Sequence, residues 1–175
     1  MATRKRKSGF TLIEVLFSLV LLALLLGAIA AATRASLNSY DENAKLAALS
    51  QTTRILLSRL RREIRTAEAI DHQADAGNVV ISPPETTGVD EIRYEYDTDT
   101  QTLRYHQTVN GETTTDTILG PDSTVRPLGL YATYDTAIVG ETLCTQRVVV
   151  TMAFEIDGRS YTVVCSAAPR RNQSF

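Results

Sequence analysis

The hydrophobic positions of this chain follow different patterns in its amino-terminal and carboxy-terminal parts. A nearly unbroken apolar run extends from Val15 to Ala32 and is interrupted by Ser18 and Gly27. As a helix rising about 1.5 Å per residue, this run would span roughly 27 Å, which is close to the thickness of a bilayer core. We therefore expect residues 10–32 to form the membrane-spanning half of a long helix.

Beyond this run, apolar positions recur every three or four residues, which predicts an extramembrane amphipathic half of the helix over residues 33–70. No proline precedes Pro83, so a straight helix from Thr11 to Ala69 would be roughly 90 Å long. The polar segment 38–42 is the place where a bend is expected. The apolar stripe consists of Leu46, Leu49, Thr53, Leu56, Leu60, Ile64, Ala67 and Ile70.

From residue 71 to residue 175 the period changes to two, which predicts strands. A short strand is expected at 79–81. A three-stranded meander is then expected at 92–96, 103–107 and 112–119, with Asn110-Gly111 as a two-residue hairpin turn. Residues 128–134 form a further predicted strand.

The last two strands are predicted together with their register. Asp157-Gly158 is a hairpin signal, and a two-residue turn there places Phe154 opposite Tyr161 and Val150 opposite Cys165. Apolar residues then meet apolar residues on one face. The expected fold is α+β, with the second half of the helix packed on a carboxy-terminal antiparallel sheet.

The charge distribution separates the first nine residues from the rest. The formal net charge is −2, but Arg4, Lys5, Arg6 and Lys7 precede any acid, so the remainder carries −6. A mildly acidic body does not indicate nucleic-acid binding. Four basic residues before the apolar run and a single Arg34 shortly after it predict a cytoplasmic amino terminus, with the body on the other side of the membrane.

No constellation of residues in the sequence indicates catalysis, a metal site or a cofactor, so we expect a protein that is not an enzyme. Asp97 and Asp99 have the spacing of a calcium-loop opening, but the later positions of that motif are absent, which favours a solvated turn. The two cysteines cannot form a four-ligand zinc cluster. The predicted register places Val150 opposite Cys165, and Cys144 comes six residues before Val150 in the chain. In an extended strand, six residues separate Cys144 from Val150 by roughly 20 Å. A Cys144–Cys165 disulfide is an alternative to Cys165 as a small core residue.

The start of the chain resembles the class III prepilin signal of type IV pilins and type II secretion pseudopilins. The resemblance rests on Lys7-Ser8-Gly9-Phe10-Thr11-Leu12-Ile13-Glu14-Val15-Leu16. It implies that residues 1–9 are a leader, that prepilin peptidase cuts after Gly9, and that Phe10 is then N-methylated. It also implies that Glu14, a carboxylate costly in lipid, neutralises the Phe10 amine of a neighbouring subunit during assembly.

Other interpretations of this segment stay open from the residues alone. A secretory signal peptide is one, although its apolar region is usually shorter and Glu14 would lie inside it. A plain signal anchor is another, and it leaves Gly9-Phe10 and Glu14 unexplained. Glu14 could also extend to the cytoplasmic interface by snorkelling, because it is close to the helix start.

Weaker likenesses in the body resemble J-type minor pseudopilins and the related W-type minor pilins. They include the helix end at residues 60–65 and the closing Pro169-Arg170-Arg171-Asn172. They imply a single-pass inner-membrane subunit with a periplasmic domain, located at a pseudopilus tip. The implied partners are prepilin peptidase, other major and minor subunits, an inner-membrane assembly platform and membrane lipid. A minor subunit of a type IV or competence pilus is the first alternative, and a signal-anchored periplasmic binding domain is the second.

Overall fold

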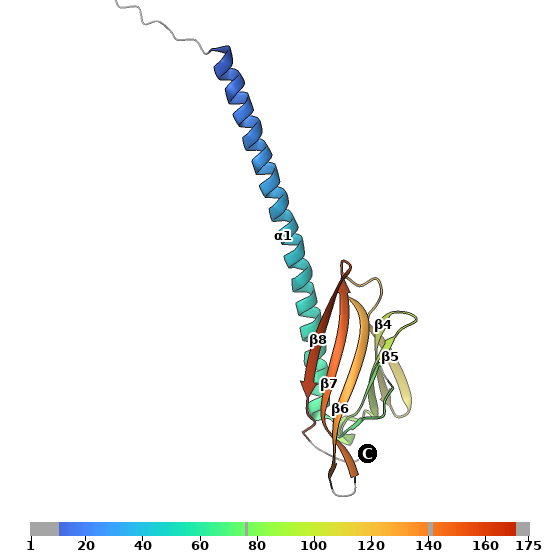
Figure 1. Cartoon of the computed structure of the whole chain (residues 1–175). Coiled ribbons are helices and arrows are strands. Elements are labelled where there is room, and N and C mark those ends of the chain that lie inside the picture. Colours follow the sequence, from blue (N-terminus) through green and yellow to red (C-terminus); the bar gives the residue numbers. More distant parts are fainter. Residues whose placement is uncertain (1–10, 76, 140–141, 171–175) are drawn as a thin grey trace, which may run out of the picture. The chain divides into compact units, whose positions relative to one another are not determined.

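Among the residues that the structure describes, one long α-helix precedes eight strands. Figure 1 shows their arrangement. The structure, a computed structural model, describes residues 11–75, 77–139 and 142–170. The chain divides into two compact units, Met1–Ala44 and Lys45–Phe175. The α+β class expected from the sequence is confirmed.

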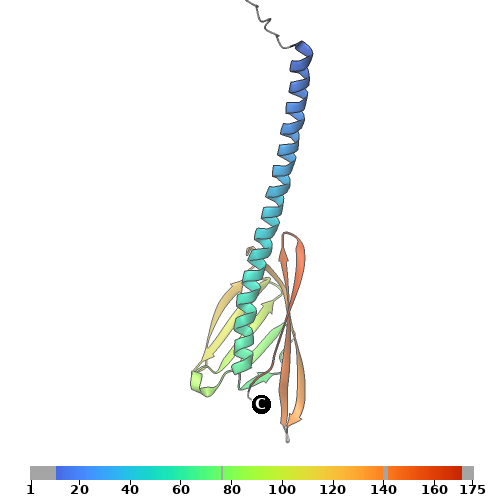
Figure 2. The same cartoon turned by 90° about the vertical axis from the view of Figure 1, so that its left-hand side faces the viewer.

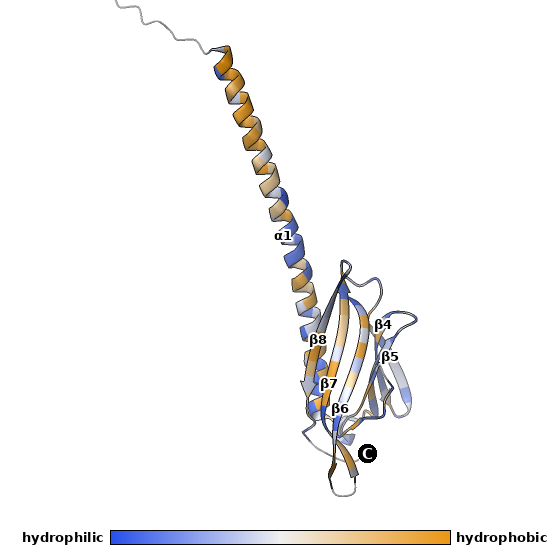
Figure 3. Cartoon of the chain, in the orientation of Figure 1, coloured by the Kyte–Doolittle hydropathy of each residue, from blue (hydrophilic) through white to orange (hydrophobic). Residues whose placement is uncertain are grey.

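The helix α1 runs from Leu12 to Thr66. It continues through residues 38–42 without interruption, in the polar segment where a bend was expected. Its first part is strongly hydrophobic, as the colouring of Figure 3 shows, and it contains a stretch long and apolar enough to cross a membrane. Large side chains such as Leu12, at 80% exposure, are open along this part. An apolar surface of this extent needs lipid or other helices to cover it.

Within the second unit the strands form two antiparallel sheets, where the sequence had suggested one. The five-stranded sheet has the order β1-β2-β3-β4-β5 and the three-stranded sheet the order β6-β7-β8. The bounds are β1 Ala69–Asp71, β2 Asn78–Ser82, β3 Glu91–Asp97, β4 Thr102–Val109, β5 Glu112–Leu119, β6 Arg126–Val139, β7 Thr142–Ile156 and β8 Arg159–Ala167, with a short 3-10 turn at Glu85–Thr87.

The predicted hairpins are confirmed. Phe154 lies opposite Tyr161 and Val150 opposite Cys165, as the Asp157-Gly158 turn required. Asp157 and Gly158 have φ values of 53° and 74°, the left-handed conformation of a tight two-residue turn. Asn110 and Gly111 adopt the same conformation between β4 and β5. Turn chemistry and the alternation of apolar residues together determine this register.

The predicted carboxy-terminal end of the helix was wrong. Ile70 had been placed at the end of the helical stripe, but the helix ends at Thr66 and Ile70 lies in β1, opposite Ile81 of β2. Ile70 is nonetheless buried, because β1 leads the chain from the helix into the core. Only Ala67 and Glu68 separate the helix from β1, and so short a gap does not let the hydrophobic period show where the helix ends and the strand begins.

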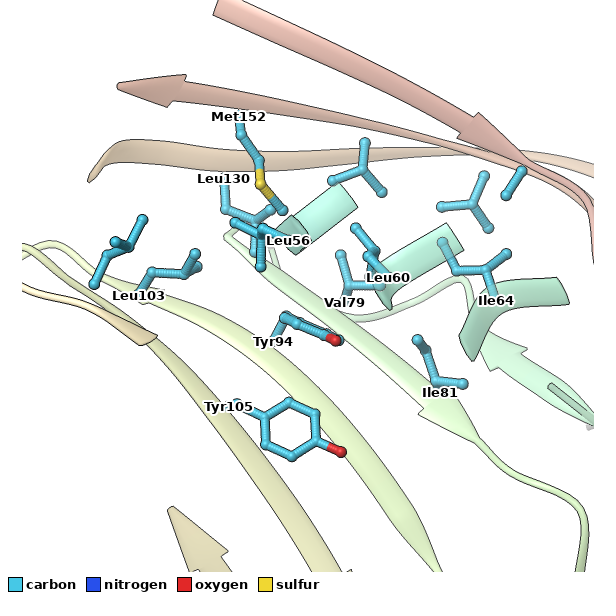
Figure 4. Packing of buried hydrophobic residues seen from close by; sticks show 14 of the residues in the cluster. Leu56, Leu60, Ile64, Val79, Ile81, Tyr94, Leu103, Tyr105, Leu130 and Met152 are labelled. Carbon is cyan, nitrogen blue, oxygen red and sulfur yellow. The ribbon is translucent and has the colours of Figure 1, made fainter. Parts of the chain in front are cut away.

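The core of the second unit lies between helix residues 45–66 and the two sheets (Figure 2). Leu56, Leu60 and Ile64 from the helix stripe meet Val79 and Tyr94 of the five-stranded sheet (Figure 4). Leu130 and Met152 of the three-stranded sheet complete this contact. Leu60 and Ile64 are fully buried, whereas Leu46 is 46% exposed. The carboxy-terminal part of the stripe is therefore the part that anchors the helix to the sheets.

Candidate processing and assembly site

The candidate processing site lies at the start of the chain, and the structure describes its carboxy-terminal side. Arg4, Lys5, Arg6, Lys7, Gly9 and Phe10 lie outside the described residues. Glu14 is described, in the first turn of α1, and its residue is exposed. All of its recorded partners come from its own segment.

Glu14 closes the first turn of the helix. Its Oε2 accepts a hydrogen bond from the backbone N–H of Thr11 and another from the Thr11 hydroxyl, each at 3.5 Å. The Glu14 amide donates to the carbonyl of Thr11 at 3.1 Å, and the Ser18 hydroxyl donates to the Glu14 carbonyl at 2.8 Å. Thr11-Leu12-Ile13-Glu14 has the spacing of a capping box, in which the third residue of the helix bonds back to the cap residue.

The capping contact gives Glu14 a local role that sequence reasoning had missed, although the pattern of Thr followed three residues later by Glu is visible in the sequence. At 3.5 Å both contacts are at the long limit for hydrogen bonds, so they hold the carboxylate weakly. A carboxylate near a helix amino terminus is also favoured by the helix dipole.

A second polar cluster, Arg59, Glu63, Tyr94 and Tyr105, joins the helix to the five-stranded sheet. The Tyr94 hydroxyl donates to Glu63 Oε2 at 2.5 Å, and Arg59 Nε donates to Glu63 Oε1 at 3.1 Å. The Arg59 guanidinium lies 3.8 Å from the centre of the Tyr105 ring. Burial, followed by the Glu63 charge, raises the pKa of Tyr94. This cluster is satisfied internally, so we read it as a structural contact.

The two cysteines occupy different places in the three-stranded sheet. Cys165 lies in β8 opposite Val150, and Cys144 lies in β7 opposite Ala137 of β6. Both are buried thiols. A disulfide would have required the chain before Val148 to double back, but β7 continues in one strand from Thr142 to Ile156. Cys165 is a small core residue in this structure.

Asp97, which had been compared with a calcium ligand, serves a turn. Its Oδ1 accepts hydrogen bonds from the backbone amides of Asp99 and Thr100 at 2.9 and 3.2 Å. Its other oxygen lies 2.9 Å from the Arg104 guanidinium. These hydrogen bonds, first of all those to Thr100, lower the pKa of Asp97. Within the residues that the structure describes, no group of three or more acidic, histidine or cysteine side chains could hold a metal ion.

Comparison with known proteins assigns the amino-terminal segment. Residues 4–30 match the family model described as the prokaryotic N-terminal methylation motif. No curated protein and no solved structure matches the chain. The matched range includes the basic leader, the Gly9-Phe10 junction, Glu14 and most of the apolar run. The chain thus combines an N-terminal methylation motif with a helix long and apolar enough to cross a membrane and an α+β layout.

Proposed function

We propose that this protein is a minor pseudopilin, a structural subunit without enzymatic activity at the tip of a periplasmic pseudopilus in type II protein secretion. The observation that carries the proposal is the match of residues 4–30 to the methylation motif, with Glu14 at the start of an exposed apolar helix. In this proposal, prepilin peptidase cuts after Gly9 and methylates Phe10. The amino terminus is cytoplasmic before cleavage, and the sheet unit is periplasmic.

The new amine at Phe10 explains why an acid belongs in the apolar segment. A lone carboxylate in hydrocarbon is strongly disfavoured, whereas one paired with a cation is tolerated. The weak capping contacts to Thr11 hold Glu14 until the amine of a neighbouring subunit replaces them. Assembly with other pilin-like subunits and with an inner-membrane platform then covers the apolar helix.

A pair of variants distinguishes this role from helix capping. Glutamine keeps a side-chain oxygen that can cap the helix but carries no charge, whereas alanine loses both. If Glu14 pairs with an amine, Glu14→Gln and Glu14→Ala should both be cleaved normally and both fail to enter filaments. Cysteine crosslinking between subunits in membranes measures that incorporation. Normal incorporation of Glu14→Gln would show that the charge is not used.

The same weaker likenesses of the body also fit a minor subunit of a type IV or competence pilus. A deletion strain separates these functions. If the protein is a pseudopilin, the deletion strain should fail to release folded secreted proteins, and its surface pili and DNA uptake should remain normal. Normal secretion together with missing pili or lost DNA uptake would assign it to the alternative machinery.

A further inference from the structure

Four arginines gather at the carboxy-terminal end of α1. Arg61, Arg62 and Arg65 are exposed on its last two turns, and Arg170 is exposed in the segment after β8. The backbone amide of Arg170 donates to the carbonyl of Arg65 at 3.1 Å, which ties that segment to the helix end. We call Arg61, Arg62, Arg65 and Arg170 the arginine surface.

Three adjoining surface hollows of about 310 to 490 Å³ run across the arginine surface. Arg65 and Arg170 line all three, and Arg61 lines two. Of the residues that the structure describes, no aspartate or glutamate lines any of them. These hollows therefore present guanidinium groups to solvent.

Other arginines of the same unit are used differently. Five of them form ion pairs with carboxylates, and these are Arg59, Arg93, Arg104, Arg126 and Arg147. In residues 11–75, 77–139 and 142–170, no ion pair is recorded for the arginine surface. A cation in the last turn of a helix is favoured by the helix dipole, which accounts for one arginine. It does not account for four like charges placed together in a body whose net charge is −6.

An apolar groove adjoins the arginine surface. It has a volume of about 340 Å³ and shares Thr66 and Pro84 with the nearest basic hollow. Its apolar lining consists of Ile81, Pro83, Pro84, Val89 and Ile92. The one carboxylate at its edge, Glu63, is already bound by Arg59 and Tyr94. A ligand that spans both features would offer negative charge at one end and an apolar group at the other.

We propose that this combined surface binds an acidic segment of another protein chain. Its carboxylates would bind the guanidinium groups of Arg61, Arg65 and Arg170, and one apolar side chain would occupy the groove. An arginine guanidinium can donate two parallel hydrogen bonds to one carboxylate. The pair is therefore held in a defined orientation as well as by charge. A small anion such as phosphate would leave the groove empty. This proposal concerns the sheet unit and stands whether or not the chain is processed at Gly9.

The test uses the full chain in zwitterionic detergent micelles and a fluorescent synthetic peptide of alternating glutamate and leucine. Arg65→Gln should weaken peptide binding about fivefold, the upper range for one exposed ion pair. Arg54→Gln is the matched control, because Arg54 is exposed on the same helix and lines none of the hollows. It should leave the affinity unchanged. A peptide with alanine in place of leucine should bind at least about fivefold more weakly, because a buried leucine side chain contributes that much or more.

Three results would overturn the proposal. Equal weakening by Arg54→Gln would show general attraction between charges. Equal binding of the alanine peptide would show that the groove is not used. Full competition by inorganic phosphate, or by phosphatidylglycerol added to the micelles at the same charge concentration, would assign the surface to small anions or lipid headgroups. Circular dichroism of each variant checks that the fold is retained.

Discussion

Replacing Tyr94 by phenylalanine tests how the helix is held to the five-stranded sheet. Tyr94 is fully buried, and its hydroxyl donates to Glu63 Oε2 at 2.5 Å. The Glu63 side chain is 15% exposed and keeps its ion pair with Arg59 in the variant. Phenylalanine fills nearly the same space, so the change removes one hydrogen bond and creates no large cavity.

The expected cost follows from the charge of the acceptor. A hydrogen bond to a charged group contributes about 1.5–3 kcal/mol, and a partly buried carboxylate that loses its donor cannot regain it fully from water. We therefore expect the free energy of unfolding of the sheet unit to fall by about 2 kcal/mol. For a unit of this size, that corresponds to a decrease in Tm of roughly 5–10 °C.

Urea unfolding of the full chain in detergent micelles, followed by circular dichroism, measures this change. Tyr131→Phe is the matched control, because Tyr131 is 59% exposed and should change the free energy by less than about 0.5 kcal/mol. Adding Glu63→Gln to Tyr94→Phe should cost less than the sum of the two single changes, since the acid and its donor act together. A Tyr94→Phe variant as stable as the control would refute the account of this contact.

Three further changes test other parts of the fold by the same unfolding measurement. Leu60→Ala should cost about 2–5 kcal/mol because Leu60 is fully buried, whereas Leu46→Ala, at a half-exposed position, should cost far less; equal costs would contradict the packing described here. Gly158→Ala should cost about 1 kcal/mol because φ is 74° there and no neighbouring atom blocks a methyl group, and an unchanged stability would contradict the turn geometry. Burial, and then the Asp71 charge, raise the pKa of Tyr134 to about 12. The tyrosine of the unfolded chain loses its proton near pH 10, so the folded state holds that proton more tightly. The contribution of protonated Tyr134 to the free energy of unfolding is therefore complete below about pH 10 and is lost as the pH rises toward about 12. The free energy of unfolding of Tyr134→Phe should fall less steeply between about pH 10 and pH 12. The same pH dependence in both proteins would contradict this role of Tyr134.

Local signals in the sequence predicted much of the sheet unit. Asp157-Gly158 and Asn110-Gly111 determine their hairpins because the left-handed turn and the alternation of apolar residues agree. The division into two sheets between β5 and β6 could not be predicted. The alternation of residues along a strand shows that it is a strand and does not show which strands it pairs with. The start of β1 was missed because Ile70 satisfies both the helical and the strand pattern.

The candidate sites differ in how well the sequence alone could predict them. The motif around Gly9, Phe10 and Glu14 is contiguous, so it was recognisable from sequence and matches the family model. The capping contact between Thr11 and Glu14 was equally local and could have been found. The arginine surface could not, because Arg170 approaches Arg65 through the path of the chain after β8, which no local pattern encodes.

Mass spectrometry of the chain purified from the membranes of its own cell shows directly whether it is cut after Gly9 and methylated. We predict a mature chain that begins with N-methyl-Phe10, and a chain left uncut when prepilin peptidase is absent. A chain that begins at Met1 or Ala2 in cells with active prepilin peptidase would contradict it. Cleavage near the end of the apolar run, as by a secretory signal peptidase, would contradict it equally.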